Sequence, residues 1–175
     1  MMRIILFIFL ICFLLTASCK NEKEQQPVEE TQEQLDARTI SQSDIASIRY
    51  TEFELSQDAY KAVIDWQKFQ ELETQVDLIK KGDLNFFKGE RLIVKTFFSE
   101  FRTEMPVTLQ TKEILARITA LDTKAQKLNS LLTISNIDKS EQLEAIKEFL
   151  ITVSNLKLQI NKKLEFEKNN IQKPE

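Results

Sequence analysis

The chain has 175 residues, enough for one ordinary domain, and its 24 basic and 27 acidic residues give a formal net charge of −3. This balance excludes the basic surface by which proteins hold nucleic acid, so no nucleic-acid partner is predicted. Histidine is absent and the two cysteines are Cys12 and Cys19, which excludes disulfide scaffolds, Cys/His zinc sites and nucleophilic catalysis by Ser-His or Cys-His pairs from the rest of the chain.

The amino-terminal segment is typical of an export signal. Arg3 precedes an uninterrupted apolar run of twelve residues, Ile4 to Leu15. A bilayer span needs roughly 20 apolar residues, so this run has the length of a signal-peptide core. We therefore assign residues 1–18 to a signal peptide.

The end of this signal resembles a lipobox, the motif in which a cysteine thiol receives diacylglycerol before cleavage on its amino side. Thr16, Ala17 and Ser18 are small residues that lead to Cys19. The resemblance implies cleavage between Ser18 and Cys19 and a lipid on Cys19, although Thr16 stands where lipoboxes usually carry Leu, Val or Ile. The alternatives are an uncleaved anchor, or a signal cut after Ser18 without lipid.

Residues 19–47 are predicted to form a lipidated, polar and flexible tether. They are rich in Gln, Glu, Ser and Thr and hold few large apolar groups, so they bury too little surface to offset the entropy of ordering. The next apolar residues, Ile48, Tyr50, Phe53 and Leu55, are too irregular for a strand and suit an extended strap across a helical domain.

The remaining sequence predicts helices, in keeping with only two glycines and three prolines in the chain. Ser56 suits an N-cap, and an apolar stripe from Ala59 to Ile79 predicts one helix over 57–80 that Gly82 closes. Asp83 can cap a short turn containing Phe86 and Phe87. The helix over 90–104 ends at Pro106, and we expect its apolar side to consist of Leu92, Ile93, Phe97, Phe98, Phe101 and Met105.

Two longer helices follow. Thr108 or Thr111 opens the first, in which Ile114, Ile118, Leu121, Ala125, Leu128 and Leu132 recur with heptad spacing. Asp138 with Glu141 indicates the start of the last helix. Because only residues 135–139 separate the two, they should pair as an antiparallel, coiled-coil-like hairpin, with the first helix docked across it. The expected fold is an all-α antiparallel bundle of three to four helices over 48–170, and 171–175 form a disordered tail.

No constellation predicts chemistry, and we assign no catalytic residue, metal ligand or cofactor. Glu71, Glu73 and Asp77 could hold a hard cation, but a solvated helix face explains them better. The rings of Trp66, Phe69, Phe97, Phe98 and Phe101 fit a core better than a ligand pocket. Lys157 interrupts the apolar side of the last helix. It either sets the register of helix pairing or, as we prefer, lays its aliphatic stem along the core and keeps its charge in water.

The chain resembles small lipoproteins of unknown function from flavobacteria (Bacteroidetes) in the stretch from Asp65 to Leu84, in Phe86-Phe87 and Gly89-Glu90, and in Ile160 to Glu165. The resemblance implies a lipid-anchored envelope protein and brings no catalytic residue. We therefore expect a non-enzymatic lipoprotein at the periplasmic face of the outer or inner membrane, held by the lipid on Cys19 and serving as a structural or protein-interaction module. The alternative is a carrier or sensor that binds an apolar ligand between its Phe-rich helices.

Overall fold

The computed structural model describes residues 39–169, which contain seven α-helices, one 3₁₀ turn and no strand. The helices are α3 (Gln42–Ala46), α4 (Gln57–Val63), α5 (Gln67–Lys80), α6 (Asn85–Lys88), α7 (Arg91–Thr103), α8 (Lys112–Thr133) and α9 (Lys139–Asn169), and the 3₁₀ turn spans Val107–Leu109. The predicted all-α fold is confirmed.

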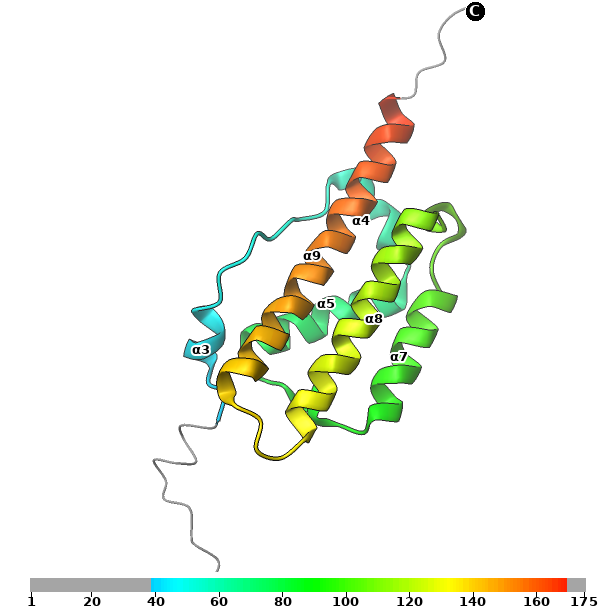
Figure 1. The fold of residues 1–175 in the computed structure, drawn as a ribbon. Coiled ribbons are helices and arrows are strands. Elements are labelled where there is room, and N and C mark those ends of the chain that lie inside the picture. Colours follow the sequence, from blue (N-terminus) through cyan, green and yellow to red (C-terminus); the bar gives the residue numbers. More distant parts are fainter. Residues whose placement is uncertain (1–38, 170–175) are drawn as a thin grey trace, which may run out of the picture. The chain divides into compact units, whose positions relative to one another are not determined.

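The predicted hairpin is formed by α8 and α9, which run antiparallel, with α7 antiparallel on the other side of α8 (Figure 1). The heptad positions of α8 from Ile114 to Leu128 are fully buried and Leu132 is partly buried, and they pack into one core with the apolar side of α9. The buried residues of the two seams are Ile114, Ile118, Leu121, Ala125 and Leu128 in α8 and Ile146, Leu150, Val153 and Ile160 in α9. Helix α5 crosses behind this layer (Figure 1).

Two helices begin at hydroxyl residues that the sequence analysis predicted as N-caps. The hydroxyl of Ser56 accepts a hydrogen bond from the backbone N–H of Ala59 at 3.2 Å, and that of Thr111 accepts one from Ile114 at 3.3 Å. Thr111, rather than Thr108, therefore caps α8. Gly82 lies just beyond α5 with φ +88°, the left-handed conformation in which a side chain would be strained.

The helix predicted over 57–80 is wrong as one continuous element, because the chain breaks between α4 and α5. At the break Trp66 adopts an extended backbone and turns its ring into the core, with 1% of the residue exposed. The carbonyl of Val63 accepts hydrogen bonds from the backbone N–H of Trp66 and from the side-chain amide of Gln70, each at 3.0 Å, and these contacts hold the break. The sequence conceals the break because the spacing of Val63, Trp66 and Phe69 is equally compatible with an unbroken helix.

Residues 48–56 form the predicted strap, and two polar side chains of α9 hold it. The hydroxyl of Ser154 accepts a hydrogen bond from Phe53 N–H at 2.7 Å and lies 3.0 Å from the carbonyl of Thr51, to which it donates. The amide of Asn161 accepts from Ser56 N–H at 2.9 Å and donates to the carbonyl of Glu54 at 2.8 Å. The backbone groups of the strap thus find partners on α9.

The packed domain begins earlier than the expected boundary at residue 48. Ile40 and Ile45 are 9% and 4% exposed, and α3 starts with a reciprocal capping box between Ser41 and Asp44. The sequence prediction placed this stretch in the tether because most of its residues are polar, although it contains two isoleucines. The remainder of the predicted tether, the signal peptide of residues 1–18 and the tail of 171–175 lie outside the described residues.

Candidate functional site

Ser18 and Cys19, the residues to which the sequence assigns signal cleavage and lipid attachment, lie outside residues 39–169. The roles of these two residues are therefore predictions from the sequence. Within the described domain, the features that invite a functional interpretation are a buried lysine, an acidic cluster, a group of aromatic rings, a buried amide and hollows on the surface.

Lys157 is buried and paired. Its ammonium nitrogen lies 2.6 Å from Oε2 of Glu73 on α5 and 4.0 Å from Oε2 of Glu54 on the strap, and 4% of the residue is exposed. The prediction that its charge extends into water is wrong, because the strap and α5 close over this part of α9 and bring carboxylates with them. The ammonium thereby ties three separate segments together.

Burial raises the pKa of the Glu73 carboxyl, although the hydrogen bond and charge of Lys157 act in the opposite direction. Its second oxygen, Oε1, is buried and accepts no hydrogen bond from the described part of the chain. Lys157 is the cation that pairs with this carboxylate; the lysine side chain is 5% exposed and that of Glu73 is 32% exposed. This geometry suits a structural contact, because the charge of the buried lysine is matched by a carboxylate of the fold.

The acidic cluster predicted on the first helix is divided between two partners. Glu71 and Glu100 each lie 2.9 Å from the ammonium of Lys68, and these hydrogen bonds raise the pKa of that lysine. Glu73 faces Lys157 instead. Residues 39–169 contain no group of three or more Asp, Glu, His or Cys side chains placed to hold a metal ion.

The aromatic residues form the core, as the sequence indicated. Ring centroids of Trp66 and Phe101 lie 4.4 Å apart, those of Trp66 and Phe69 5.4 Å, and those of Phe97 and Phe98 5.1 Å. All five of these residues are buried. Because the rings contact one another, they fill the space that an apolar ligand would need.

Asn129 is a buried polar residue that the sequence analysis missed. The residue is 1% exposed, and its amide nitrogen donates to the carbonyls of Phe87 and Gly89, each at 2.9 Å. It thereby satisfies the backbone where α6 ends and turns toward α7. Its spacing of four and three residues from Ala125 and Leu132 was a signal that this amide lies on the buried side of α8.

Two hollows of about 360 Å³ and about 380 Å³ lie beside α7 and share Leu92 in their walls. Phe86, Ile93 and Phe97 line the first, and Arg91 and Lys95 line the second. The expected apolar side of α7 was wrong at its start, because Leu92 and Ile93 are 68% and 53% exposed whereas Val94 is fully buried. Val94, Phe97, Phe98 and Phe101 form one buried stripe, and helical geometry turns residues 92 and 93 away from it.

Among residues 39–169, no helix is both long enough and apolar enough to cross a bilayer. Comparison of the whole chain with family models, with curated proteins and with solved structures found no match.

Proposed function

We propose that this chain is a non-enzymatic lipoprotein of the bacterial cell envelope, anchored at the periplasmic face of the outer or inner membrane through lipid on Cys19. The observation that carries the proposal is the order of the first 19 residues: a cation, twelve apolar residues, three small residues and a cysteine. Lipid modification at roughly 0.8 kcal/mol per buried CH₂ group gives lasting attachment when several acyl chains are present.

The described domain supports a structural or protein-interaction role. Its buried lysine is paired, and its aromatic rings pack on one another. Its hollows are open to the surface: two lie beside α7, and a larger one of about 520 Å³ is lined by residues from the start of α8 and from α9. A hydrolase built from carboxylates alone needs two acids that converge on a cleft with pKa values driven apart. Glu73 and Glu54 converge instead on the Lys157 ammonium, which is the arrangement of a structural ion pair.

The anchor is tested by labelling the full-length chain with a radioactive fatty acid during expression in a bacterium with lipoprotein-processing enzymes. The wild-type chain should incorporate label, and Cys19→Ala should not, because the substitution removes the thiol that receives the lipid. Cys12→Ala is the matched control, because it removes a thiol from within the apolar run, and it should leave labelling unchanged. Equal labelling of the Cys19→Ala chain would contradict the proposal.

The interaction role is tested by crosslinking in the native envelope. A protein partner should be recovered with the wild-type chain and lost when residues 1–19 are replaced by an export signal that is cleaved without lipid, since release from the membrane separates the domain from its neighbours. Equal recovery with both chains would show that anchoring has no part in the interaction.

A further inference from the structure

The first turn of α7 exposes two adjacent large apolar side chains. Leu92 and Ile93 are 68% and 53% exposed, and Leu92 borders both hollows beside the helix. Single exposed apolar residues are common, but neighbouring ones beside an apolar hollow, here the one lined by Phe86 and Phe97, indicate a contact surface. Ile134, in the connection between α8 and α9, is also exposed, at 55%.

Unpaired cations surround these two residues. Lys88, Arg91 and Lys95 are exposed and form no ion pair with any residue of the described domain. Two carboxylates lie near them: Glu90, the one acidic residue between positions 88 and 96, and Asp122 of α8, which lines the second hollow together with Arg91 and Lys95. We call Lys88, Arg91, Leu92, Ile93 and Lys95 the α7 patch. It combines apolar side chains with a local excess of positive charge, the combination that suits an anionic lipid surface.

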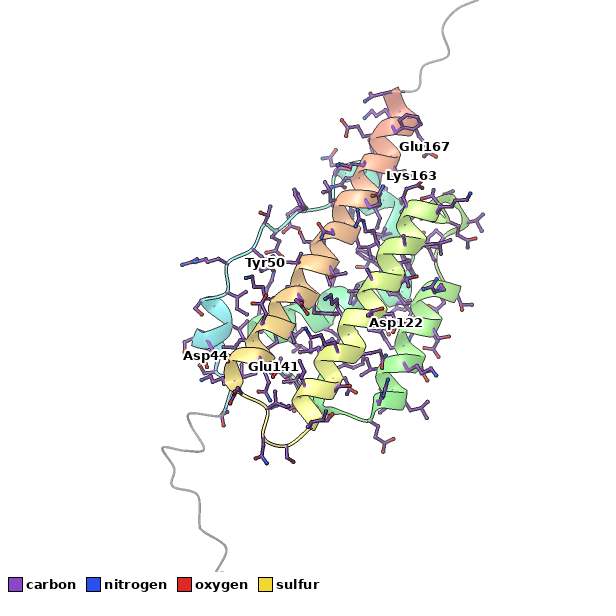
Figure 2. The ribbon with its side chains drawn as sticks, viewed as in Figure 1. Asp44, Tyr50, Asp122, Glu141, Lys163 and Glu167 are labelled. Atoms are coloured by element: carbon purple, nitrogen blue, oxygen red, sulfur yellow. The ribbon has the colours of Figure 1, made fainter. Side chains whose placement is uncertain are left out.

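The α7 patch lies at the end of the bundle where the chain enters the domain. Figure 1 shows the start of α7, the connection between α8 and α9, and the entry to α3 at one end, and the last turns of α9 at the other. Figure 2 labels residues at both ends, Asp44 and Glu141 near the entry and Lys163 and Glu167 far from it. Nineteen residues separate Cys19 from Thr39; they lie outside the described residues, and the flexible tether that the sequence predicts there would reach about 25 Å.

We propose that the α7 patch is a second membrane contact, which docks on anionic phospholipid headgroups and holds the bundle with α7 toward the bilayer. This proposal rests on lipid attachment at Cys19. The anchor keeps the domain within reach of the surface, so the patch needs only weak affinity to fix its orientation. Leu92 and Ile93 enter the headgroup region while Lys88, Arg91 and Lys95 contact phosphate.

The test uses the full-length, lipid-modified chain carrying a single added cysteine, since Cys19 itself is acylated and Cys12 lies in the signal. Leu92→Cys and Val107→Cys are labelled with a polarity-sensitive fluorophore and placed in vesicles with or without phosphatidylglycerol. Val107 is the matched control, because it is apolar, 82% exposed and located between α7 and α8 at the other end of the bundle.

The label at position 92 should shift to the blue and be quenched by lipid-borne nitroxides when phosphatidylglycerol is present, and the label at 107 should do neither. Adding Arg91→Gln and Lys95→Gln to Leu92→Cys should reduce the docking equilibrium constant about 25-fold, since each basic side chain near an anionic surface contributes about fivefold. Equal responses at 92 and 107, or a label at 92 that stays in water, would overturn the proposal.

Two outcomes separate this proposal from the anchor itself. A chain that partitions into the membrane but leaves the label at 92 in water contradicts the α7 patch alone. A chain that lacks lipid at Cys19 contradicts both. Protection of the label in native envelopes but not in protein-free vesicles would overturn membrane docking in favour of a protein partner.

Discussion

The ammonium nitrogen of Lys157 lies 2.6 Å from a carboxylate oxygen of Glu73, in a contact where the lysine is 4% exposed. The pair joins α5 to α9, and Glu54 at 4.0 Å brings the strap to the same cation. A lysine so deeply buried is costly unless its charge is matched, so the strap and α5 must remain in place for the fold to tolerate it.

Glu73→Gln should lower the free energy of unfolding by about 3 kcal/mol, because it leaves a buried ammonium without its nearest partner. Lys157→Met should cost less, since the Glu73 carboxyl already has a raised pKa and takes up a proton more readily. The double variant should recover most of the loss. Urea denaturation followed by circular dichroism measures all three.

Glu71→Gln is the control for this series. Glu71 lies on the same helix, but Lys68 keeps Glu100 at 2.9 Å when Glu71 is neutral. Its effect should stay below about 0.5 kcal/mol, as for other exposed pairs. A Glu73→Gln effect as small as that of Glu71→Gln would mean that the Lys157 charge is solvated.

Asn129→Asp should destabilise the fold by about 2–4 kcal/mol. The substitution keeps the shape of the side chain but replaces the donor with an oxygen that faces the carbonyls of Phe87 and Gly89, which leaves buried acceptors unpaired or repelled. Asn85→Asp is the matched control, because Asn85 is exposed at the start of α6, and it should change stability by less than about 0.5 kcal/mol. Equal effects of the two variants on the urea midpoint would refute the assigned role.

Asp44 should make the stability of the domain depend on pH in the acid range. A hydrogen bond from Lys139, followed by those from Ser41, lowers its pKa from 3.8 to about 2. Because the folded-state pKa is depressed, the unfolded chain binds the proton first; the contribution of Asp44 is complete above about pH 4 and disappears as the pH falls toward 2. Asp44→Asn should therefore lower the urea midpoint at pH 6 and have little effect at pH 2.

Lys139→Gln provides the control for the Asp44 prediction. Removing the ammonium 2.6 Å from the Asp44 carboxylate should bring the pKa of this carboxyl back toward 3.8. A carboxyl-carbon NMR titration reads the change directly. An unchanged titration would show that Lys139 does not stabilise the carboxylate.

The sequence predicted elements well where one physical signal dominated. The heptad spacing predicted α8, and the ends of helices were predicted from the hydroxyls of Ser56 and Thr111 and from Pro106. The short connection after α8 predicted the antiparallel hairpin. Local signals failed where tertiary contacts decide. Lys157 is buried because carboxylates from distant parts of the sequence pair with it. Trp66 interrupts a helix because its ring packs against Phe101 in the core. Neither feature can be predicted from the residues that are adjacent in sequence.

The assignment of function depended on a different kind of signal. Cys19 is proposed as the lipidation site from the order of the residues immediately before it, a signal that does not depend on the fold. The α7 patch required the structure, because the pattern of α7 assigned Leu92 and Ile93 to the core, and only the packing of Val94 showed that they face outward.

The most direct test of the account is the mass of the amino-terminal peptide from the mature protein, purified from bacterial membranes. We predict a chain that begins at Cys19 and carries a diacylglyceryl group on its sulfur. A chain that retains residues 1–18, or one that begins at Cys19 with an unmodified thiol, would contradict the central claim that lipid at Cys19 anchors the helical domain.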